Sequence, residues 1–310
     1  MRKALVYTVD EREVALALFS ARSAALLHPN RDFDIVIASL APLQVPTELA
    51  RLGIRNAVVD AAEAMAAERL KLDWLPLVAY LRLWLPSAFA DRYDRLVYLD
   101  ADTCIVAPGL SRLFDVDLGP HVLGAVLDKE QWLAPGEPVL DFAQRGIAVD
   151  RYLNSGVLLI DVGRYNGSGS LGAVLDVHRA GRPTLFHDQS LLNLALQGQF
   201  AELSPRWNWQ WTHRYPALTR PARPFVLHFG GPPKPWHAHA EPTRHPAAIV
   251  EAYAEFLTGV GSPLAFQTGR RGGMRAPLYR QLSNLVGHKD VWPRYRRLMR
   301  RVPDPFTARL

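Results

Sequence analysis

The sequence predicts an α/β protein with one mostly parallel sheet that is flanked by helices. Short apolar segments typical of strands alternate with longer segments typical of helices along most of the 310 residues. Such alternation is typical of a parallel sheet covered by helices. The chain is 49% hydrophobic and 21% charged, which indicates a globular protein with one large domain, with or without an extension. No segment approaches the roughly 18–20 uninterrupted apolar residues of a membrane span.

The elements follow from local residue patterns. Short apolar runs rich in Val, Ile, Leu and Tyr predict strands over 4–8, 33–39, 57–60, 96–100, 122–127 and 157–161. Helices are predicted over the alanine-rich stretch 11–27, over 75–89 with its apolar residues at helical spacing, and over 188–196. Residues 205–246 are rich in Pro, Trp and His and are interpreted as an ordered loop that lines a cleft. The tryptophans of 207–211 would either stack on an acceptor sugar or belong to the core. The Gly/Arg-rich stretch 269–273 is a linker candidate.

Two carboxylates follow the apolar strand 96–100. Asp100 and Asp102 are separated only by the small Ala101. Unpaired carboxylates are costly to bury, so both are expected just beyond the carboxyl end of the strand, where open α/β sheets bind ligands. Such a pair suits a divalent cation that in turn holds phosphates. A solvated turn after a core strand is the alternative.

A second segment, 228–236, carries complementary chemistry. His228 offers an imidazole ligand for an ion such as Mn²⁺, and Lys234 offers a compact cation for phosphate oxygens. Gly231 permits close backbone approach, and the prolines around it restrict the loop. Each residue alone would more often be structural. Together with Asp100 and Asp102 they suit a metal-bound diphosphate.

Two polar segments complete the set. Asn154 lies in an Asn-Ser-Gly corner before a buried strand, where it would either aim its amide at a ligand or form a turn. Asp188 and Gln189 stand at a predicted helix start. Asp188 there would either serve the site or cap the helix, and the neutral Gln189 could contact a sugar.

These four segments together resemble the glycosyltransferases of family 8, which include glycogenin and bacterial lipopolysaccharide galactosyl- and glucosyltransferases. The resemblance rests on 100–102, 154–156, 188–189 and the His-x-x-Gly-x-x-Lys-Pro-Trp block of 228–236. It implies a nucleotide-sugar transferase domain of the GT-A type over 1–258, followed by a basic helical extension over 259–310. It also implies a retaining enzyme that depends on Mn²⁺, with Mg²⁺ as the alternative ion. Such an enzyme moves a hexose from a UDP-sugar to a glycan or lipid-linked acceptor, in lipopolysaccharide or another surface polysaccharide.

The resemblance implies a role for each site residue. The metal ligands would be Asp100, Asp102 and His228. The donor would be bound by Thr8, Asp10, Arg82, Asn154, Gly231 and Lys234. Catalytic positions beside the donor sugar would be Gln189, Asp188 and Asp128. The chain departs from the family after Asp10, where a base-contacting Tyr is usual and 11–14 reads Glu-Arg-Glu-Val. Uracil as the base therefore rests on the family alone.

Other functions and mechanisms stay open. A nucleotidyltransferase would carry a Gly-rich phosphate loop after the first strand, which residues 8–13 lack. A nucleotide-sugar hydrolase would differ only in assay, and a non-catalytic sugar-binding protein is disfavoured because every metal and phosphate position is present. For retention, front-face attack is favoured, and a covalent intermediate on Asp188 or Asp128 is the alternative.

The charge distribution and the cysteine content predict which partners the protein has and in which compartment it lies. The net charge of +6 arises in the last 50 residues, which hold eleven basic side chains and two acidic ones. Apolar residues there (Leu278, Leu282, Leu285, Val286; Val291, Tyr295, Leu298, Met299) fall on helical faces among arginines. Residues 270–310 would therefore either lie on an anionic membrane surface or pack on the domain with a solvated Arg face. Nucleic acid is not expected. The single Cys104 and the early acids at 10–13 predict a cytoplasmic protein, peripheral on the membrane in the first case.

Overall fold

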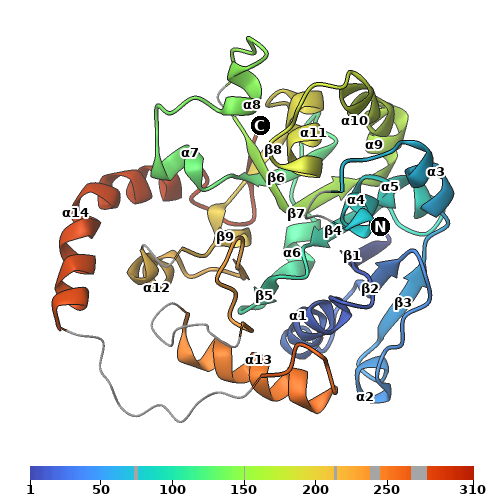
Figure 1. Cartoon of the computed structure of the whole chain (residues 1–310), viewed down its shortest axis with the longest axis horizontal. Coiled ribbons are helices and arrows are strands. Elements are labelled where there is room, and N and C mark those ends of the chain that lie inside the picture. The colour runs from blue at the N-terminus through green and yellow to red at the C-terminus, as the bar shows by residue number, and fades with distance from the viewer. Residues whose placement is uncertain (73–75, 150, 213–214, 238–244, 267–277) are drawn as a thin grey trace.

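The computed structural model describes residues 1–72, 76–149, 151–212, 215–237, 245–266 and 278–310, with side chains left out over 278–288. The linker candidate 269–273 lies outside these residues, as do the side chains of Arg280, Leu278, Leu282, Leu285 and Val286. An eight-stranded sheet forms the centre (Figure 1). Its strands in spatial order are β11 (Ala308–Arg309), β8 (Ala201–Leu203), β6 (Leu123–Leu127), β7 (Leu153–Asp161), β4 (Arg95–Leu99), β1 (Lys3–Thr8), β2 (Asp34–Ser39) and β3 (Ile54–Val58).

Four of the seven strand pairings in this sheet are parallel, so the predicted fold class is confirmed. The α-helices are α1 (Val14–Leu27), α2 (Thr47–Ala50), α3 (Ala62–Ala67), α4 (Leu77–Tyr80), α5 (Leu85–Ala88), α6 (Leu110–Phe114), α7 (Glu130–Leu133), α8 (Leu140–Ala143), α9 (Val162–Gly167), α10 (Ser170–Arg179), α11 (His187–Leu196), α12 (Thr219–Ala222), α13 (Ala247–Gly259) and α14 (Leu278–Arg301). Short 3₁₀ turns occupy Leu81–Leu83, Pro205–Trp207 and Pro216–Leu218.

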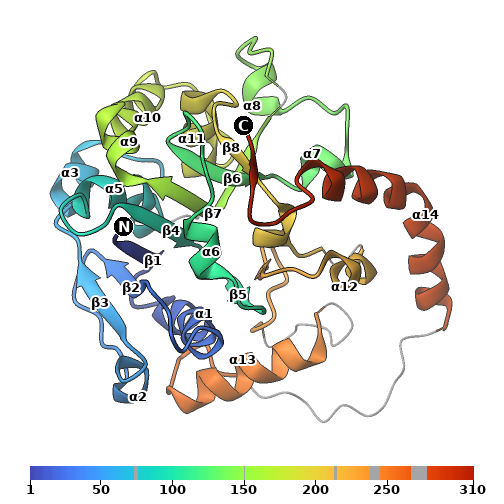
Figure 2. The ribbon, with the colours of Figure 1, turned by 180° about the vertical axis from the view of Figure 1, so that it is seen from behind.

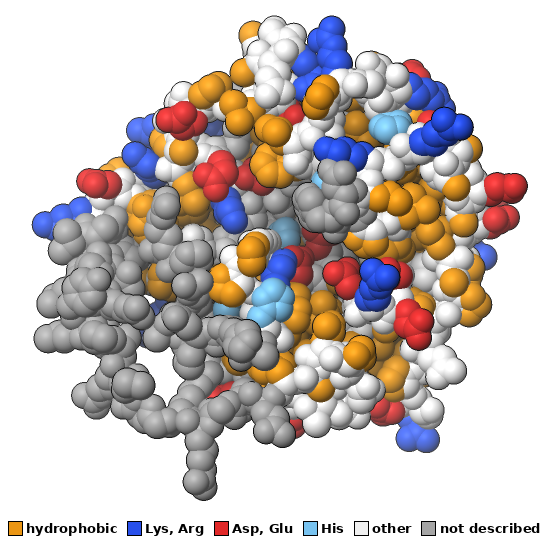
Figure 3. Space-filling model, in the orientation of Figure 1, with side chains coloured by type: hydrophobic (Ala, Val, Ile, Leu, Met, Phe, Trp, Pro, Cys, Tyr) orange, Lys and Arg blue, Asp and Glu red, His pale blue; other side chains and the backbone are white. Residues whose placement is uncertain are grey.

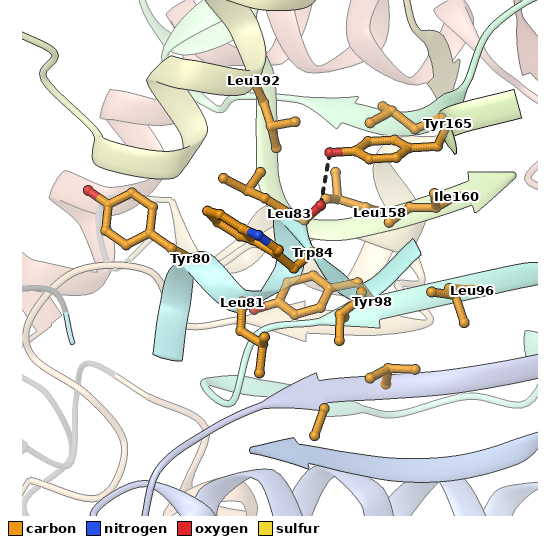
Figure 4. Close-up of a cluster of buried hydrophobic side chains, with 14 of the residues drawn as sticks. Tyr80, Leu81, Leu83, Trp84, Leu96, Tyr98, Leu158, Ile160, Tyr165 and Leu192 are labelled. Atoms are coloured by element: carbon orange, nitrogen blue, oxygen red, sulfur yellow. Dashed lines mark hydrogen bonds between the residues drawn. The ribbon is translucent and has the colours of Figure 1, made fainter. Parts of the chain in front are cut away.

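Alternating strand residues build a core on each face of the sheet. Ala4 and Val6 of β1 face one core, which includes residues of α3 and α11. Leu5 and Tyr7 of the same strand face the other core, which includes residues of α1 and α6. Figure 4 shows the first of these cores, in which Trp84 lies among side chains from the central strands. Tyr165 donates a hydrogen bond to the carbonyl of Leu83 there, at 3.1 Å. Since successive strand residues face opposite sides, these apolar runs are buried on both faces.

A second, smaller sheet takes two of its three strands from the segment 205–246, which was expected to be an ordered loop. Its order is β5 (Thr103–Ile105), β10 (Val226–His228) and β9 (Trp209–Gln210). Trp207, Trp209 and Trp211 are all buried, so they belong to the core and are not available to stack on an acceptor sugar. The expectation missed these strands because they are only two or three residues long, too short for a period to register. Gly230, Gly231, Lys234 and Trp236 of the same segment line a pocket, in line with the cleft that was expected, and residues 213–214 and 238–244 lie outside the described part.

Three further element boundaries differ from the expectation. The helix expected over 75–89 is broken into α4, a 3₁₀ turn and α5, because Pro86 has no backbone N–H to continue a helix. The strand expected over 57–60 lies earlier, where Ile54 pairs with Ile35. The strand expected over 157–161 begins at Leu153, so Asn154 lies within β7 and not in a corner before it.

The C-terminal segment returns to the sheet. Val291, Tyr295 and Leu298 of α14 are buried against the second sheet and its surroundings. The chain then runs back so that β11 pairs with β8, and the view from behind shows the C-terminus beside β8 (Figure 2). Trp207 donates its indole N–H to the carbonyl of Pro305 at 2.5 Å. Among the described residues, no helix combines the length and apolar character that crossing a bilayer requires.

Candidate active site

Three potential metal ligands meet at the carboxyl end of β4. Asp100 follows the last residue of β4, and Asp102 precedes β5. The antiparallel pairing of β10 with β5 places His228 opposite Thr103, next to Asp102. The His228 Nε2 atom lies 3.2 Å from Asp102 Oδ1 and 3.7 Å from Asp100 Oδ2, and the ligand atoms of the three residues all lie within 4.8 Å of one another. Two carboxylates and an imidazole so close together fit a divalent ion such as Mn²⁺ or Mg²⁺.

The imidazole of His228 is fixed from two sides. Its Nδ1 atom lies 3.0 Å from Asn208 Oδ1, which leaves Nε2 facing the two carboxylates. On the other side lies Gly156 of β7, where a Cβ atom would stand only 2.3 Å from His228 Cε1 and 2.9 Å from Asp100 Oδ2. Outer partners of this kind orient a metal-binding histidine. Because Gly156 has no side chain, the His228 ring and the Asp100 carboxylate fit beside it.

Lys234 brings a positive charge to the same point. Its Nζ atom donates to Asp102 Oδ2 at 2.5 Å and to the carbonyl of Phe229 at 2.8 Å. Burial opposes ionisation of Asp102, but His228 and Lys234 outweigh it and hold the pKa of Asp102 below its ordinary value. Asp102 is therefore an anion at neutral pH, as a metal ligand must be.

Arg82 is buried beneath the site. Its guanidinium forms ion pairs with Asp100 at 2.9 Å and with Asp188 at 3.3 Å, and it lies 4.6 Å from the ring centre of Tyr98. Burial alone would lower the pKa of Arg82, but Asp100 and Asp188 raise it. Tyr98 also donates to Asp100 at 2.7 Å. Arg82 thus joins the metal end of the pocket to the end at α11.

A polar network occupies the end of the pocket at α11. Gln189 accepts hydrogen bonds from Asn154 Nδ2 and from the backbone of Ser155, both at 3.1 Å, and donates to Asp128 at 3.2 Å. Asp188 accepts from Ser155 Oγ at 3.1 Å. Asp188 stands in the first turn of α11, which begins after Phe186. Burial raises the pKa of Asp188, and Arg82 opposes this shift.

One pocket of about 390 Å³ contains most of these groups, within reach of the roughly 300–1,000 Å³ usual for small-molecule sites. Acidic, basic and histidine side chains gather around a hollow in the face shown in Figure 3. Ten of the twelve predicted site residues line the pocket: Thr8, Arg82, Asp100, Asp102, Asn154, Asp188, Gln189, His228, Gly231 and Lys234. The other two do not. Asp10 accepts from the backbone of Arg12, and Asp128 contacts the pocket only through Asn154 and Gln189.

Sequence reasoning missed several groups that shape this pocket. Asn208, which holds His228, stands in a tryptophan-rich stretch that shows no signal for it. Ser155 and Gly156 belong to the Asn-Ser-Gly motif, but their contacts cross the sheet to Asp188 and His228. Tyr98 sits inside an apolar run and looked like core. Only the proximity of distant segments could have identified them.

Comparisons with known proteins identify the family and the fold. A family model described as glycosyl transferase family 8 matches residues 5–240. General stress protein A of Bacillus subtilis is 30% identical over 213 residues, which are 63% of this chain and 71% of that protein. The lipopolysaccharide 1,3-galactosyltransferase of Salmonella typhimurium is 27% identical over 172 residues, 51% of this chain and 49% of that protein. The match to glycosyltransferase GlyF of Streptococcus pneumoniae spans 58% of that longer relative. The structure of galactosyltransferase LgtC with donor and acceptor sugar analogues shares the fold, with a TM-score of 0.66 at 24% identity, over 83% of this chain and 95% of LgtC.

Proposed function

Because this chain belongs to glycosyltransferase family 8, we propose that it is a retaining hexosyltransferase that uses a UDP-sugar and depends on Mn²⁺, with Mg²⁺ as the alternative ion. The transferase domain would be residues 1–258, and residues 259–310 its basic extension. The acceptor would be a glycan or a lipid-linked glycan of a lipopolysaccharide or other surface polysaccharide. The observation that carries the proposal is one pocket holding Asp100, Asp102 and His228 next to Lys234.

The charges of the pocket suit cleavage of a sugar–diphosphate bond. Asp100, Asp102 and His228 would hold the ion, which supplies Lewis-acid stabilisation of the leaving diphosphate when it is bound. Lys234 would add a fixed positive charge, and Gly231 an open backbone approach. Thr8 and Asp10, at the end of β1, would bind the nucleoside. Negative charge develops on the diphosphate as the bond breaks, so cations placed in advance lower the barrier.

The network at α11 supports front-face attack. Asp188 is held by Arg82 and Ser155, and Asp128 accepts from Asn154, Gln189 and the backbone of Glu130. A carboxylate held in this way is a poor nucleophile. In front-face attack the sugar–phosphate bond breaks, the acceptor oxygen bonds to the same face of the sugar carbon, and the acceptor proton passes to the departing phosphate oxygen. Gln189 and Asn154 would position the sugar.

Two substitutions test the division of roles. Asp102→Asn should leave the fold intact, because the side chain lies beyond the strand, and should abolish Mn²⁺-dependent turnover. Lys234→Ala should weaken UDP binding measured by calorimetry, whereas Gln189→Ala should lower kcat and leave UDP affinity unchanged. Full activity in the presence of EDTA would overturn the metal assignment. If Gln189→Ala weakened UDP binding as much as Lys234→Ala, the placement of the sugar would be wrong.

We also propose a cytoplasmic protein that binds the inner membrane face through its basic extension. Arg296, Arg297, Arg300 and Arg309 are exposed and surround an open hollow on α14. Since Val291, Tyr295 and Leu298 are buried in the protein, attraction would come from charge and not from insertion of that face. Each well-placed basic residue near an anionic surface contributes about 1 kcal/mol.

Charge reversal tests this contact better than truncation. Deleting residues 270–310 would remove β11 and the buried face of α14, so a loss of binding would have two explanations. Reversal of Arg296, Arg297 and Arg300 to Glu should instead reduce sedimentation with anionic liposomes at low salt. The matched control is reversal of the exposed Arg22, Arg51 and Arg220. Equal liposome binding by both triple variants would rule the surface out.

A further inference from the structure

A second hollow lies beside the proposed active site, and exposed apolar side chains surround it. Leu140, Leu185 and Phe186 are 54%, 42% and 52% exposed, and all three line this hollow of about 190 Å³. It lies between α7, α8 and the segment that leads into α11. Single exposed apolar residues are ordinary on a protein surface, but a group around one concavity indicates a binding site.

This hollow adjoins the place where the donor sugar would lie. Phe186 lines both the hollow and the larger pocket. Asp128 also lines the hollow, and its carboxylate accepts hydrogen bonds from Asn154 at 3.1 Å and Gln189 at 3.2 Å. Asn154 and Gln189 line the larger pocket. A molecule in the hollow would therefore lie next to the sugar end of the donor, along the wall formed by Asp128 and Phe186.

The walls of the hollow are fixed to each other. Asp141 of α8 is 1% exposed and accepts hydrogen bonds from the backbone of Leu185 at 3.2 Å, from Ser190 Oγ at 2.6 Å and from Tyr152 OH at 2.8 Å. Arg145 donates to the carbonyl of Pro183 at 2.6 Å. The two walls are thus held at a set separation before any ligand arrives, which limits the entropic cost of binding.

The chemistry of the lining restricts the occupant. Asp128, Glu130, Glu137 and the buried Asp141 are the acidic groups of the hollow, and no Lys, Arg or His occurs among the described lining residues. Negative charge repels a phosphate or a carboxylate and tolerates hydroxyl or amino groups. The apolar wall offers Phe186 and two leucines to the apolar face of a sugar ring or to an apolar aglycone. At about 190 Å³, the hollow holds one unit of a larger acceptor.

We propose that this hollow is the acceptor subsite next to the reacting hydroxyl, and that it accepts an uncharged or amino-bearing unit with an apolar face while rejecting phosphorylated or acidic units. The proposal rests on the proposed transferase function and adds a substrate class to it. A lipid-linked acceptor would present its neutral glycan end here and keep its phosphate outside. The sequence pattern contained no signal for this, because the lining comes from three separate segments.

The test measures binding of p-nitrophenyl hexosides, methyl hexosides and hexose 6-phosphates by saturation-transfer NMR, with and without Mn²⁺ and UDP. The p-nitrophenyl hexosides should bind about tenfold more tightly than the methyl hexosides, and the phosphates should not bind. Leu140→Ala and Leu185→Ala should weaken p-nitrophenyl hexoside binding about fivefold and leave UDP affinity unchanged. Phe186 is not used, because it also lines the donor pocket. Leu26→Ala is the matched control, since Leu26 is 52% exposed on α1.

Charge is tested separately. Glu137→Lys should allow hexose 6-phosphates to bind, because it replaces an acidic group of the hollow with a basic one. The subsite is overturned if no p-nitrophenyl hexoside binds, if Leu140→Ala and Leu26→Ala behave alike, or if phosphates bind the unmodified protein as well as neutral sugars do. Failure of UDP to bind with Mn²⁺ would overturn the donor assignment instead, and the measurements without nucleotide would still report on the hollow.

Discussion

Replacing Gly156 with Ala should disable the metal site while leaving the fold in place. Gly156 lies in β7 without an unusual φ angle, so its backbone accepts an alanine. The added Cβ would stand 2.3 Å from His228 Cε1, 2.7 Å from His228 Nδ1 and 2.9 Å from Asp100 Oδ2. The substitution therefore tests only the space that the glycine leaves for two metal ligands.

The size of the effect follows from these distances. Restoring an ordinary contact requires a shift of the imidazole by about 1 Å, and His228 is only 5% exposed, with its Nδ1 atom bound to Asn208. Metal ligands tolerate errors of only about 0.2 Å. We therefore expect Mn²⁺ affinity to fall by about 100-fold and the free energy of unfolding to fall by about 1–3 kcal/mol from the crowding.

Calorimetric titration with Mn²⁺ measures the first quantity, and urea denaturation without metal measures the second. Gly172→Ala in α10 is the matched control, because its Cβ would meet nothing within 4 Å. That variant should gain about 0.5–1 kcal/mol in stability from helix propensity and bind Mn²⁺ normally. If Gly156→Ala bound Mn²⁺ as tightly as the unmodified protein, the assignment of His228 as a ligand would be refuted.

Three further outcomes are expected. His28 is buried, with its Nε2 atom accepting the backbone N–H groups of Gly109 and Leu110 at 2.8 and 3.1 Å, and burial lowers its pKa below 6.5. Since the unfolded chain then binds the proton more readily, the free energy of unfolding should fall as pH drops below about 6.5. In His28→Asn the free energy of unfolding, measured by urea denaturation at several pH values, should depend less on pH. Trp207→Phe, which removes the hydrogen bond to Pro305, should cost about 1–3 kcal/mol in denaturation without changing UDP affinity; weaker UDP binding would contradict this. EDTA should abolish turnover and lower Tm, and excess Mn²⁺ should restore both, whereas an unchanged Tm would argue against a bound ion.

The fold class and most of the pocket could be predicted because their signals are local. The runs that became β1, β2, β4 and β6 are apolar over consecutive residues, which is typical of strands buried on both faces. Asp100 and Asp102 were identified by their place after such a run, and the 228–236 block by its dense functional groups. These predictions depended on neighbours in the chain.

The remainder depends on contacts between distant segments. The three-stranded sheet forms because β10 pairs across more than a hundred residues with β5, and its strands are too short to predict alone. Arg82 was expected near the donor and does line the pocket, but its ion pairs with Asp100 and Asp188 had no signal in the sequence. Asn208 and Gly156 matter only because His228 lies between them. A periodic pattern or motif within one segment does not predict which side chains of another segment will contact it.

The position of Arg82 has a thermodynamic consequence. One guanidinium serves a carboxylate at the metal end and another at the sugar end, so a cation that takes negative charge from Asp100 changes how strongly Arg82 is held by Asp188. Occupancy at either end then alters affinity at the other, and linkage requires the same factor in both directions. Binding of a metal ion and binding of a donor sugar would then be coupled through this one side chain.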